Sequence, residues 1–122
     1  MGFLDKVKQA AEAGTKMAAE KVGGSASLRD AYLGMKAPAK SGVYRVYYRR
    51  QLMKVGKATD GLRKRFSDYY RGMEGGTAGL KYITRENRDD VHVQWMLCPA
   101  SQARAMETRL YDQAKANGET LP

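Results

Sequence analysis

The sequence predicts an α+β fold in one domain, and three observations lead to that prediction. The spacing of apolar residues changes from a helical period to a period of two at Gly42, so strands follow helices. A second alternating segment occurs at residues 91–98, beyond an intervening helical pattern. The length of 122 residues, of which 43% are hydrophobic, supports one core rather than two. A hairpin plus a distant third strand, with helices outside, predicts an α+β sandwich.

The first part of the chain predicts two helices. Residues 2–22 carry apolar side chains at helical spacing and predict an amphipathic helix that ends at Gly23-Gly24. Ser27 is a candidate N-cap of a second, shorter helix, because Asp30 follows three residues later as in a capping box. Pro38 ends this helix. Its apolar side consists of Leu28, Ala31, Tyr32 and Met35.

Two strands joined by a turn follow Gly42. Residues 43–48 are rich in β-branched and aromatic residues, which predicts a strand. Arg49-Arg50-Gln51 predicts a hairpin turn into a second strand over residues 52–56.

A helix and an ambiguous segment come next. Asp60 is a candidate cap for a helix over residues 61–71. Residues 77–88 follow a glycine-rich loop, and we expect a short helix there. The apolar stripe of the first helix consists of Leu62, Phe66, Tyr69 and Tyr70.

A strand and a helix complete the chain. Residues 91–98 alternate, with Val91, Val93, Trp95 and Leu97 on one face. Ser101 is a candidate cap for a last helix over residues 102–117, which Gly118 ends.

Positive charge is concentrated in residues 45–71. The chain has a net charge of +9, and this stretch has nine Lys and Arg against two Asp, a net charge of +7. Basic residues neutralise phosphates, and the interleaved tyrosines can stack on unpaired bases. The charge therefore predicts a polyanionic partner, either nucleic acid or an anionic membrane. A solvated basic face with core tyrosines is the alternative.

Several classes of protein are excluded by the composition. One cysteine, Cys98, cannot form an internal disulfide, and one histidine, His92, cannot complete a Cys/His zinc site. We expect Cys98 to be a small buried residue, and His92 to be a sheet-face residue or a proton donor. No apolar run is long enough to span a bilayer, and no secretory signal is recognisable, so we expect no stable membrane insertion and a cytoplasmic location.

Two charged residues lie inside apolar stripes. Arg65 falls between Leu62 and Phe66 on the helix over residues 61–71. Glu107 falls among the apolar positions of the last helix. A buried ionised carboxylate is costly unless it is paired or binds a metal, so both residues are candidates for function. An internal Arg65–Glu107 salt bridge, or a side chain that reaches solvent at the edge of the stripe, is the structural alternative.

Residues 42–47 (GVYRVY), 54–60 (KVGKATD) and 62–70 (LRKRFSDYY) together resemble the GIY-YIG nuclease family. Within it, they are most similar to the nuclease domain of the bacterial excision-repair incision subunit. The resemblance covers residues 40–122. It leaves residues 1–24 as a helical extension and residues 25–39 as a short helix and linker. It implies a small three-stranded antiparallel sheet flanked by helices.

The resemblance implies a metal-dependent endonuclease that hydrolyses DNA phosphodiester bonds. Tyr44 matches the tyrosine of the first triplet, expected as the base, and Lys57 matches the lysine of the repair-type variant. Arg65 matches the helix arginine that braces the phosphate. Glu107 matches the single acidic ligand of Mg²⁺ or Mn²⁺. For Tyr44 to act as a base, nearby positive charge must lower its pKa.

Lys54 departs from the family pattern, since it stands where the second triplet has a tyrosine. A lysine there can serve as a proton acceptor or as a phosphate contact. This departure leaves open a second function, that of a nucleic-acid-binding or assembly component that is catalytically weak or inactive. The residues expected to contact nucleic acid are Arg45, Arg49, Arg50, Arg63, Lys64, Tyr69 and Arg71.

The amphipathic segment at residues 2–22 has three possible roles: packing on the domain, docking on a protein partner, or lying on a membrane. Its alanine-rich apolar side and small net charge are weak features for membrane binding. We therefore expect packing or docking.

Overall fold

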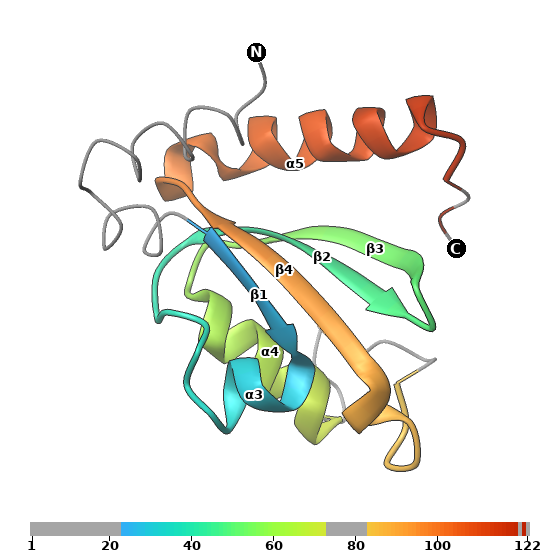
Figure 1. The fold of residues 1–122 in the computed structure, drawn as a ribbon. Helices are drawn as coiled ribbons and strands as arrows, with labels where there is room; N and C mark the ends of the chain where they lie inside the picture. The colour runs from blue at the N-terminus through green and yellow to red at the C-terminus, as the bar shows by residue number, and fades with distance from the viewer. Residues whose placement is uncertain (1–22, 73–82, 120, 122) are drawn as a thin grey trace, which may run out of the picture.

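A computed structural model describes residues 23–72, 83–119 and 121. Its central element is a four-stranded antiparallel sheet with the order β1-β4-β2-β3. Helices α3 and α4 cover one face of the sheet, and α5 covers the other (Figure 1). The elements are β1 (Gly23–Ser27), α3 (Leu28–Tyr32), β2 (Gly42–Tyr48), β3 (Gln51–Ala58), α4 (Leu62–Arg71), the 3-10 helix η2 (Arg88–Asp90), β4 (Val91–Leu97) and α5 (Ala100–Ala116). The α+β class is confirmed.

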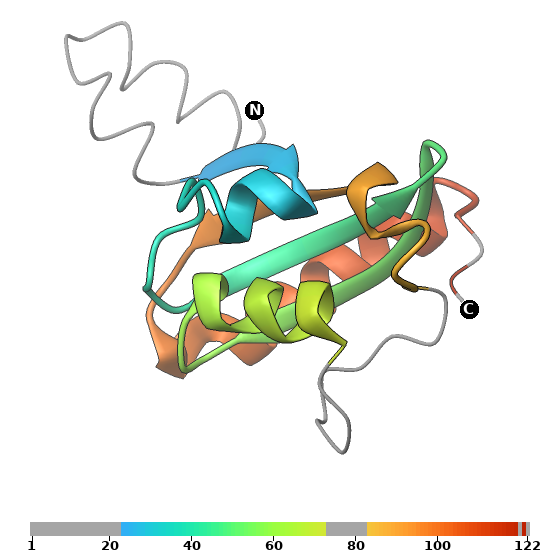
Figure 2. The ribbon, with the colours of Figure 1, turned by 90° about the horizontal axis from the view of Figure 1, so that it is seen from below.

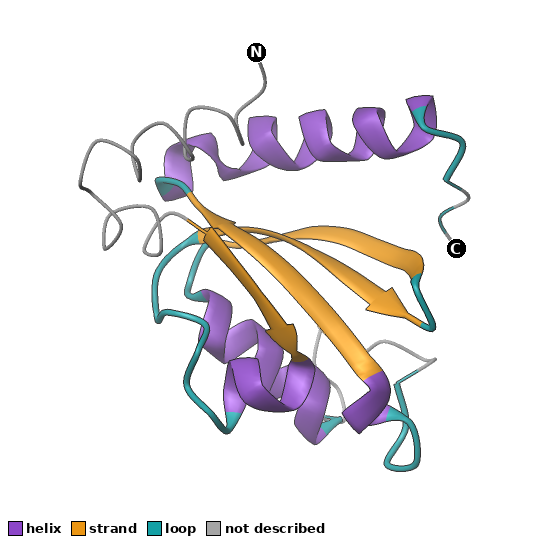
Figure 3. Ribbon diagram, viewed as in Figure 1, coloured by secondary structure: helices purple, strands orange, loops and turns teal. Residues whose placement is uncertain are grey.

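The arrangement of layers is clear from two directions. In Figure 3 the strands form one layer between the helices. Figure 2, seen from below, places α3 and α4 in front of the sheet and α5 behind it. None of the helices in the described residues is long and apolar enough to cross a bilayer.

The sheet has four strands rather than the expected three, because β1 joins its edge. Gly23-Gly24 was expected to end a helix, and instead it begins a strand that pairs antiparallel with β4. A Cβ at Gly24 would lie 2.6 Å from the Trp95 ring, so glycine is needed where the indole packs. A strand with two glycines has low intrinsic propensity, and pairing with β4 overrides it.

Helix α3 begins where the capping pattern predicts. The backbone N–H of Asp30 donates to Ser27 Oγ at 3.0 Å. Leu28 and Ala31 are fully buried, so residues 23–39 contribute to the same sheet and core as the rest of the domain. The helix ends at Tyr32, well before Pro38. The expected apolar role of Met35 is wrong, since this residue has a φ of 54° and is 63% exposed.

The predicted hairpin is confirmed as β2 and β3. Its turn is the two-residue pair Arg49-Arg50, and Gln51 already belongs to β3. The pairing shifts after Val46, which leaves Met53 as the extra residue of a bulge.

Helix α4 and its apolar stripe are confirmed, but its cap differs from the expectation. Gly61, with a φ of 128°, is the N-cap, and no side chain caps the helix. Asp60 instead forms an ion pair with Lys64 at 2.8 Å.

The last strand is confirmed, and the last helix begins earlier than expected. Helix α5 starts at Ala100 after Pro99, so Ser101 lies inside the helix and does not cap it. Of the helix expected at residues 77–88, residues 77–82 lie outside the described residues. Residues 83–84 are irregular, and residues 85–87 form a turn before η2. The helix expected at residues 2–22 also lies outside the described residues.

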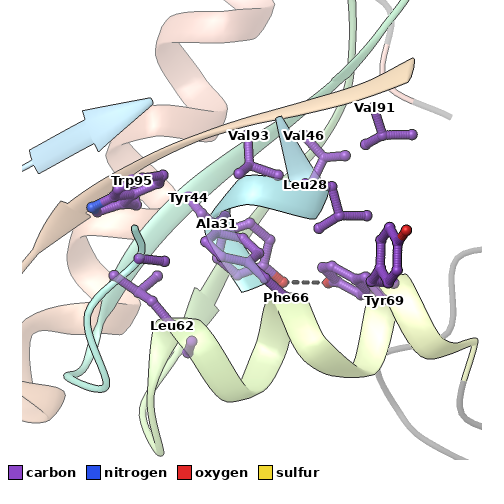
Figure 4. Packing of buried hydrophobic residues seen from close by; sticks show 13 residues of the cluster. Leu28, Ala31, Tyr44, Val46, Leu62, Phe66, Tyr69, Val91, Val93 and Trp95 are labelled. Carbon is purple, nitrogen blue, oxygen red and sulfur yellow. Dashed lines mark hydrogen bonds between the residues drawn. The ribbon is translucent and has the colours of Figure 1, made fainter. Parts of the chain in front are cut away.

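The core consists of two apolar clusters, one on each face of the sheet. Successive residues of a strand point to opposite faces, so Val43 packs toward α5 while Tyr44 packs toward α4. Figure 4 shows the α4 side, where the Tyr44 ring meets Phe66 edge-on with centroids 5.4 Å apart. The α5 side contains Val43, Leu52, Val55, Ala103, Leu110 and Ala114.

The N-cap of α3 yields a stability prediction. Ser27→Ala removes the acceptor of the Asp30 N–H and should lower the free energy of unfolding by about 1 kcal/mol. A loss of this size lowers Tm by about 4–8 °C in a domain of this class. Thermal unfolding followed by circular dichroism measures the shift. Ser25→Ala, an exposed change on the adjacent strand, is the control, and equal Tm values for the two variants would contradict the cap.

Candidate active site

Two buried tyrosines form the centre of the candidate site. Tyr44 on β2 and Tyr69 on α4 are each 2% exposed, and their hydroxyls share a hydrogen bond (Figure 4). Gly56 on β3 pairs with Tyr44, and a Cβ there would lie 2.5 Å from the Tyr44 hydroxyl oxygen. The glycine therefore makes room for the phenol, and the hydrogen bond satisfies two polar groups in an apolar environment.

Burial controls the charge of this pair. Loss of hydration strongly raises the pKa of Tyr44, and Tyr69 raises it further through its charge and its hydrogen bond. Loss of hydration also raises the pKa of Tyr69, although the hydrogen bond from Tyr44 opposes this. Arg65 lowers the pKa of both phenols, but burial outweighs its effect. The lowered pKa expected of a Tyr44 base is not found, and both hydroxyls are neutral at physiological pH.

Arg65 lies one helical turn before Tyr69 on α4 and is half-buried. Its Nε is buried and has no hydrogen-bond partner in the described part of the chain. A buried donor without an acceptor costs free energy, so this guanidinium is suited to donate a hydrogen bond to a ligand oxygen.

Glu107 lies on α5, between the buried Ala103 and Leu110, and is half-buried as the apolar pattern predicts. Helix α5 covers the opposite face of the sheet. Burial is the main cause of the raised pKa values of Tyr44 and Tyr69, and the Glu107 carboxylate makes only a minor contribution to each. The structural alternative, an internal salt bridge between Arg65 and Glu107, is not found. Among the described residues the only ion pair is Lys64–Asp60. Arg65 and Glu107 thus act electrostatically on the same two hydroxyls.

The two candidate lysines lie on opposite faces of the edge strand β3. Lys54 pairs with Val46 and faces the same side as Tyr44. Lys57 pairs with Val43 and faces α5, the helix that carries Glu107. Both side chains are half-buried. Strand β3 therefore places one ammonium group on each face of the sheet.

Several of the residues expected to contact nucleic acid instead form contacts within the protein. Arg63 Nε donates to the carbonyl of Ala37 at 2.9 Å, and Arg45 donates to Gln113 at 3.5 Å. Lys64 pairs with Asp60. Tyr69 is buried and does not form the exposed stacking surface expected of it. Exposed positions remain at Arg49, Arg50 and Arg71, the last of which lies 3.5 Å from Ser67 Oγ.

The role of Tyr69 as the partner of Tyr44 was not predicted. The signal that could have indicated it is its spacing of four residues from Arg65, which puts both on one side of α4. That Tyr44 of β2 lies opposite Tyr69, however, is decided by the tertiary fold.

The available donors fit a hard cation that keeps most of its waters. Residues 23–72 and 83–119 contain no group of three or more His, Cys, Asp or Glu that could hold a metal. A single carboxylate such as Glu107 suits Mg²⁺ or Mn²⁺, which keep most of their waters, and not a cage of protein ligands. His92 is exposed, and burial raises the pKa of the half-buried Cys98 thiol.

Comparison with known proteins gives no relative. No family model, no curated protein and no solved structure matches the chain.

The buried phenols yield a pH prediction. Because their folded-state pKa values lie above the unfolded value of about 10, the folded protein retains protons that the unfolded chain releases. The free energy of unfolding should therefore fall as the pH rises above about 10.

Denaturant unfolding at a series of alkaline pH values measures this fall. Tyr44→Phe removes one of the two phenols and should make the fall less steep, whatever its effect at neutral pH. Tyr111→Phe, at a site that is 38% exposed, is the matched control. If the free energy of unfolding of Tyr44→Phe fell with pH as steeply as that of the wild type, the raised pKa of Tyr44 would be contradicted.

Proposed function

We propose that the protein is a metal-dependent endonuclease that hydrolyses phosphodiester bonds of DNA. The site comprises Tyr44, Tyr69, Arg65 and Glu107. The observation that carries the proposal is the buried Arg65 Nε without a partner, beside two buried hydroxyls. A phosphate oxygen would supply the missing acceptor, and a guanidinium binds phosphate oxygens through its forked donors.

The resemblance of residues 40–122 to the GIY-YIG family supports three of these four residues by a separate route. The motif match selects Tyr44, Arg65 and Glu107 from residue order. Arg65 and, more weakly, Glu107 influence the pKa of Tyr44, which supports a common role for the three residues.

The reaction requires a water to lose a proton, negative charge to be stabilised on the phosphate, and the 3′ oxygen to leave. Arg65 would hold the non-bridging oxygens, and the neutral hydroxyls of Tyr44 and Tyr69 would orient the water through hydrogen bonds. Glu107 would hold Mg²⁺ or Mn²⁺, and such an ion, when bound, offsets the negative charge of the phosphate. Lys54 would contact the phosphate backbone as an ammonium group, or would take up the proton lost by the water if it were a neutral amine.

The neutral, buried state of Tyr44 favours a second candidate function. Burial holds the pKa of Tyr44 well above its usual value, which disfavours a role as a base, and Lys54 replaces the second tyrosine of the family pattern. The alternative is a nucleic-acid-binding component with this fold and weak catalysis. It predicts DNA binding without cleavage.

Substitution of the two charged residues tests the endonuclease. Arg65→Ala and Glu107→Gln should each slow the nicking of supercoiled plasmid by about 100-fold or more, since each removes a group that stabilises charge. Circular dichroism establishes that the variants fold. Arg104→Ala and Asp112→Asn, exposed positions on α5, are the matched controls. Nicking at the wild-type rate by folded Arg65→Ala or Glu107→Gln would reject the assignment.

Removal of divalent metal separates the two candidate functions. Nicking in Mg²⁺ or Mn²⁺ should stop in EDTA, while retardation of DNA in a gel persists. Nicking that continues in EDTA would contradict the metal role of Glu107. Binding with no nicking in either metal would support the second candidate.

A further inference from the structure

A groove lies on the part of the sheet that α5 leaves open. Helix α5 packs on Val43, Leu52 and Val55 of β2 and β3, whereas His92 and Gln94 of β4 remain exposed on the same face. The groove has a volume of about 390 Å³, within the range of small-ligand sites. It extends from the β2–β3 turn to the start of β4, which lie at the same end of the sheet (Figure 1).

Two arginines form one end of this groove. Arg49 and Arg50 are the two residues of the hairpin turn, and their φ values of 52° and 65° are both left-handed. Such a turn favours Asn and Gly, because a side chain with a Cβ is strained in this conformation. The turn thus has an arginine at each of two positions where its left-handed geometry disfavours that residue.

Neither guanidinium is neutralised within the described residues. Arg49 lies over the Tyr48 ring, with 5.1 Å from its Cζ to the ring centroid, and Arg50 has no partner there. The lining includes one carboxylate, Asp90, so the groove is cationic. Tyr47, His92 and Gln94 add an aromatic ring and polar groups. Strain of this kind is a feature of functional sites.

We propose that this groove binds a nucleotide unit of a nucleic-acid strand, with its phosphate held by Arg49 and Arg50. The proposal rests on the proposed function and adds a second contact for the same substrate. Tyr47 faces the opposite side of β2 from Tyr44 and lies roughly 10 Å farther along the strand. The groove is therefore distinct from the site around Arg65.

The double substitution Arg49→Asn/Arg50→Gly tests the proposal without endangering the fold. It replaces the strained pair with the residues the turn favours, so Tm should rise by about 4 °C or more. Binding of a fluorescently labelled single-stranded oligonucleotide, measured by anisotropy in EDTA, should weaken about tenfold or more. The slope of log affinity against log salt should become shallower by about 1.4, as expected for the loss of two phosphate contacts.

Arg104→Gln/Arg109→Gln is the matched control, because it also removes two exposed positive charges, from α5. It should weaken binding much less. Equal losses in the two variants would overturn the proposal, since they would indicate general electrostatics. A lower Tm together with weaker binding would also overturn it, because the arginines would then serve the fold.

A nucleoside 5′-monophosphate distinguishes a strand from a free nucleotide. Isothermal titration should show that it binds the wild type more weakly than the oligonucleotide does, and tighter binding of the free nucleotide would overturn the proposal. Failure of the two proposals is separable. Wild-type nicking with unchanged binding by Arg49→Asn/Arg50→Gly rejects only the groove, and specific binding without nicking rejects only the endonuclease.

Discussion

The hydrogen bond between the hydroxyls of Tyr44 and Tyr69 constrains the structure around it. The two phenols lie in an apolar core, where each polar group needs a partner and where the charged form is disfavoured. Gly56 provides the space that the Tyr44 ring requires. One strand pair and helix α4 are thereby fixed relative to each other, and the hydroxyls stay neutral. The chemistry open to the site follows from that neutrality.

The alternation of side chains along the strands divides the candidate site between two faces of the sheet. Tyr44 and Lys54 face α4, whereas Lys57 faces the helix that carries Glu107. Strand β3 is at the edge of the sheet, and helices pack against it from both sides. The proposed site therefore draws its side chains from both faces of an edge strand.

The excess positive charge serves two purposes that composition does not separate. Arg63 secures the segment before β2 by donating to Ala37, and Lys64 pairs with Asp60. Arg49 and Arg50, by contrast, occupy a strained turn and form no ion pair within the described residues. The density of positive charge predicts a polyanionic partner, but it does not show which side chains would bind that partner. Only the contacts of each side chain distinguish the cations that hold the fold from those left to bind a ligand.

The sequence by itself determined the features that depend on near neighbours: the hairpin of β2 and β3, the Ser27 cap, and the half-buried position of Glu107 on the last helix. Each follows from spacing within a few residues. Tertiary structure alone decided that the Gly23–Ser27 segment is a strand, since its pairing partner β4 lies far along the chain. It also decided that Tyr69 is a buried partner rather than a surface ring. Burial and strand pairing join distant segments, and local spacing does not encode the free energy of those contacts.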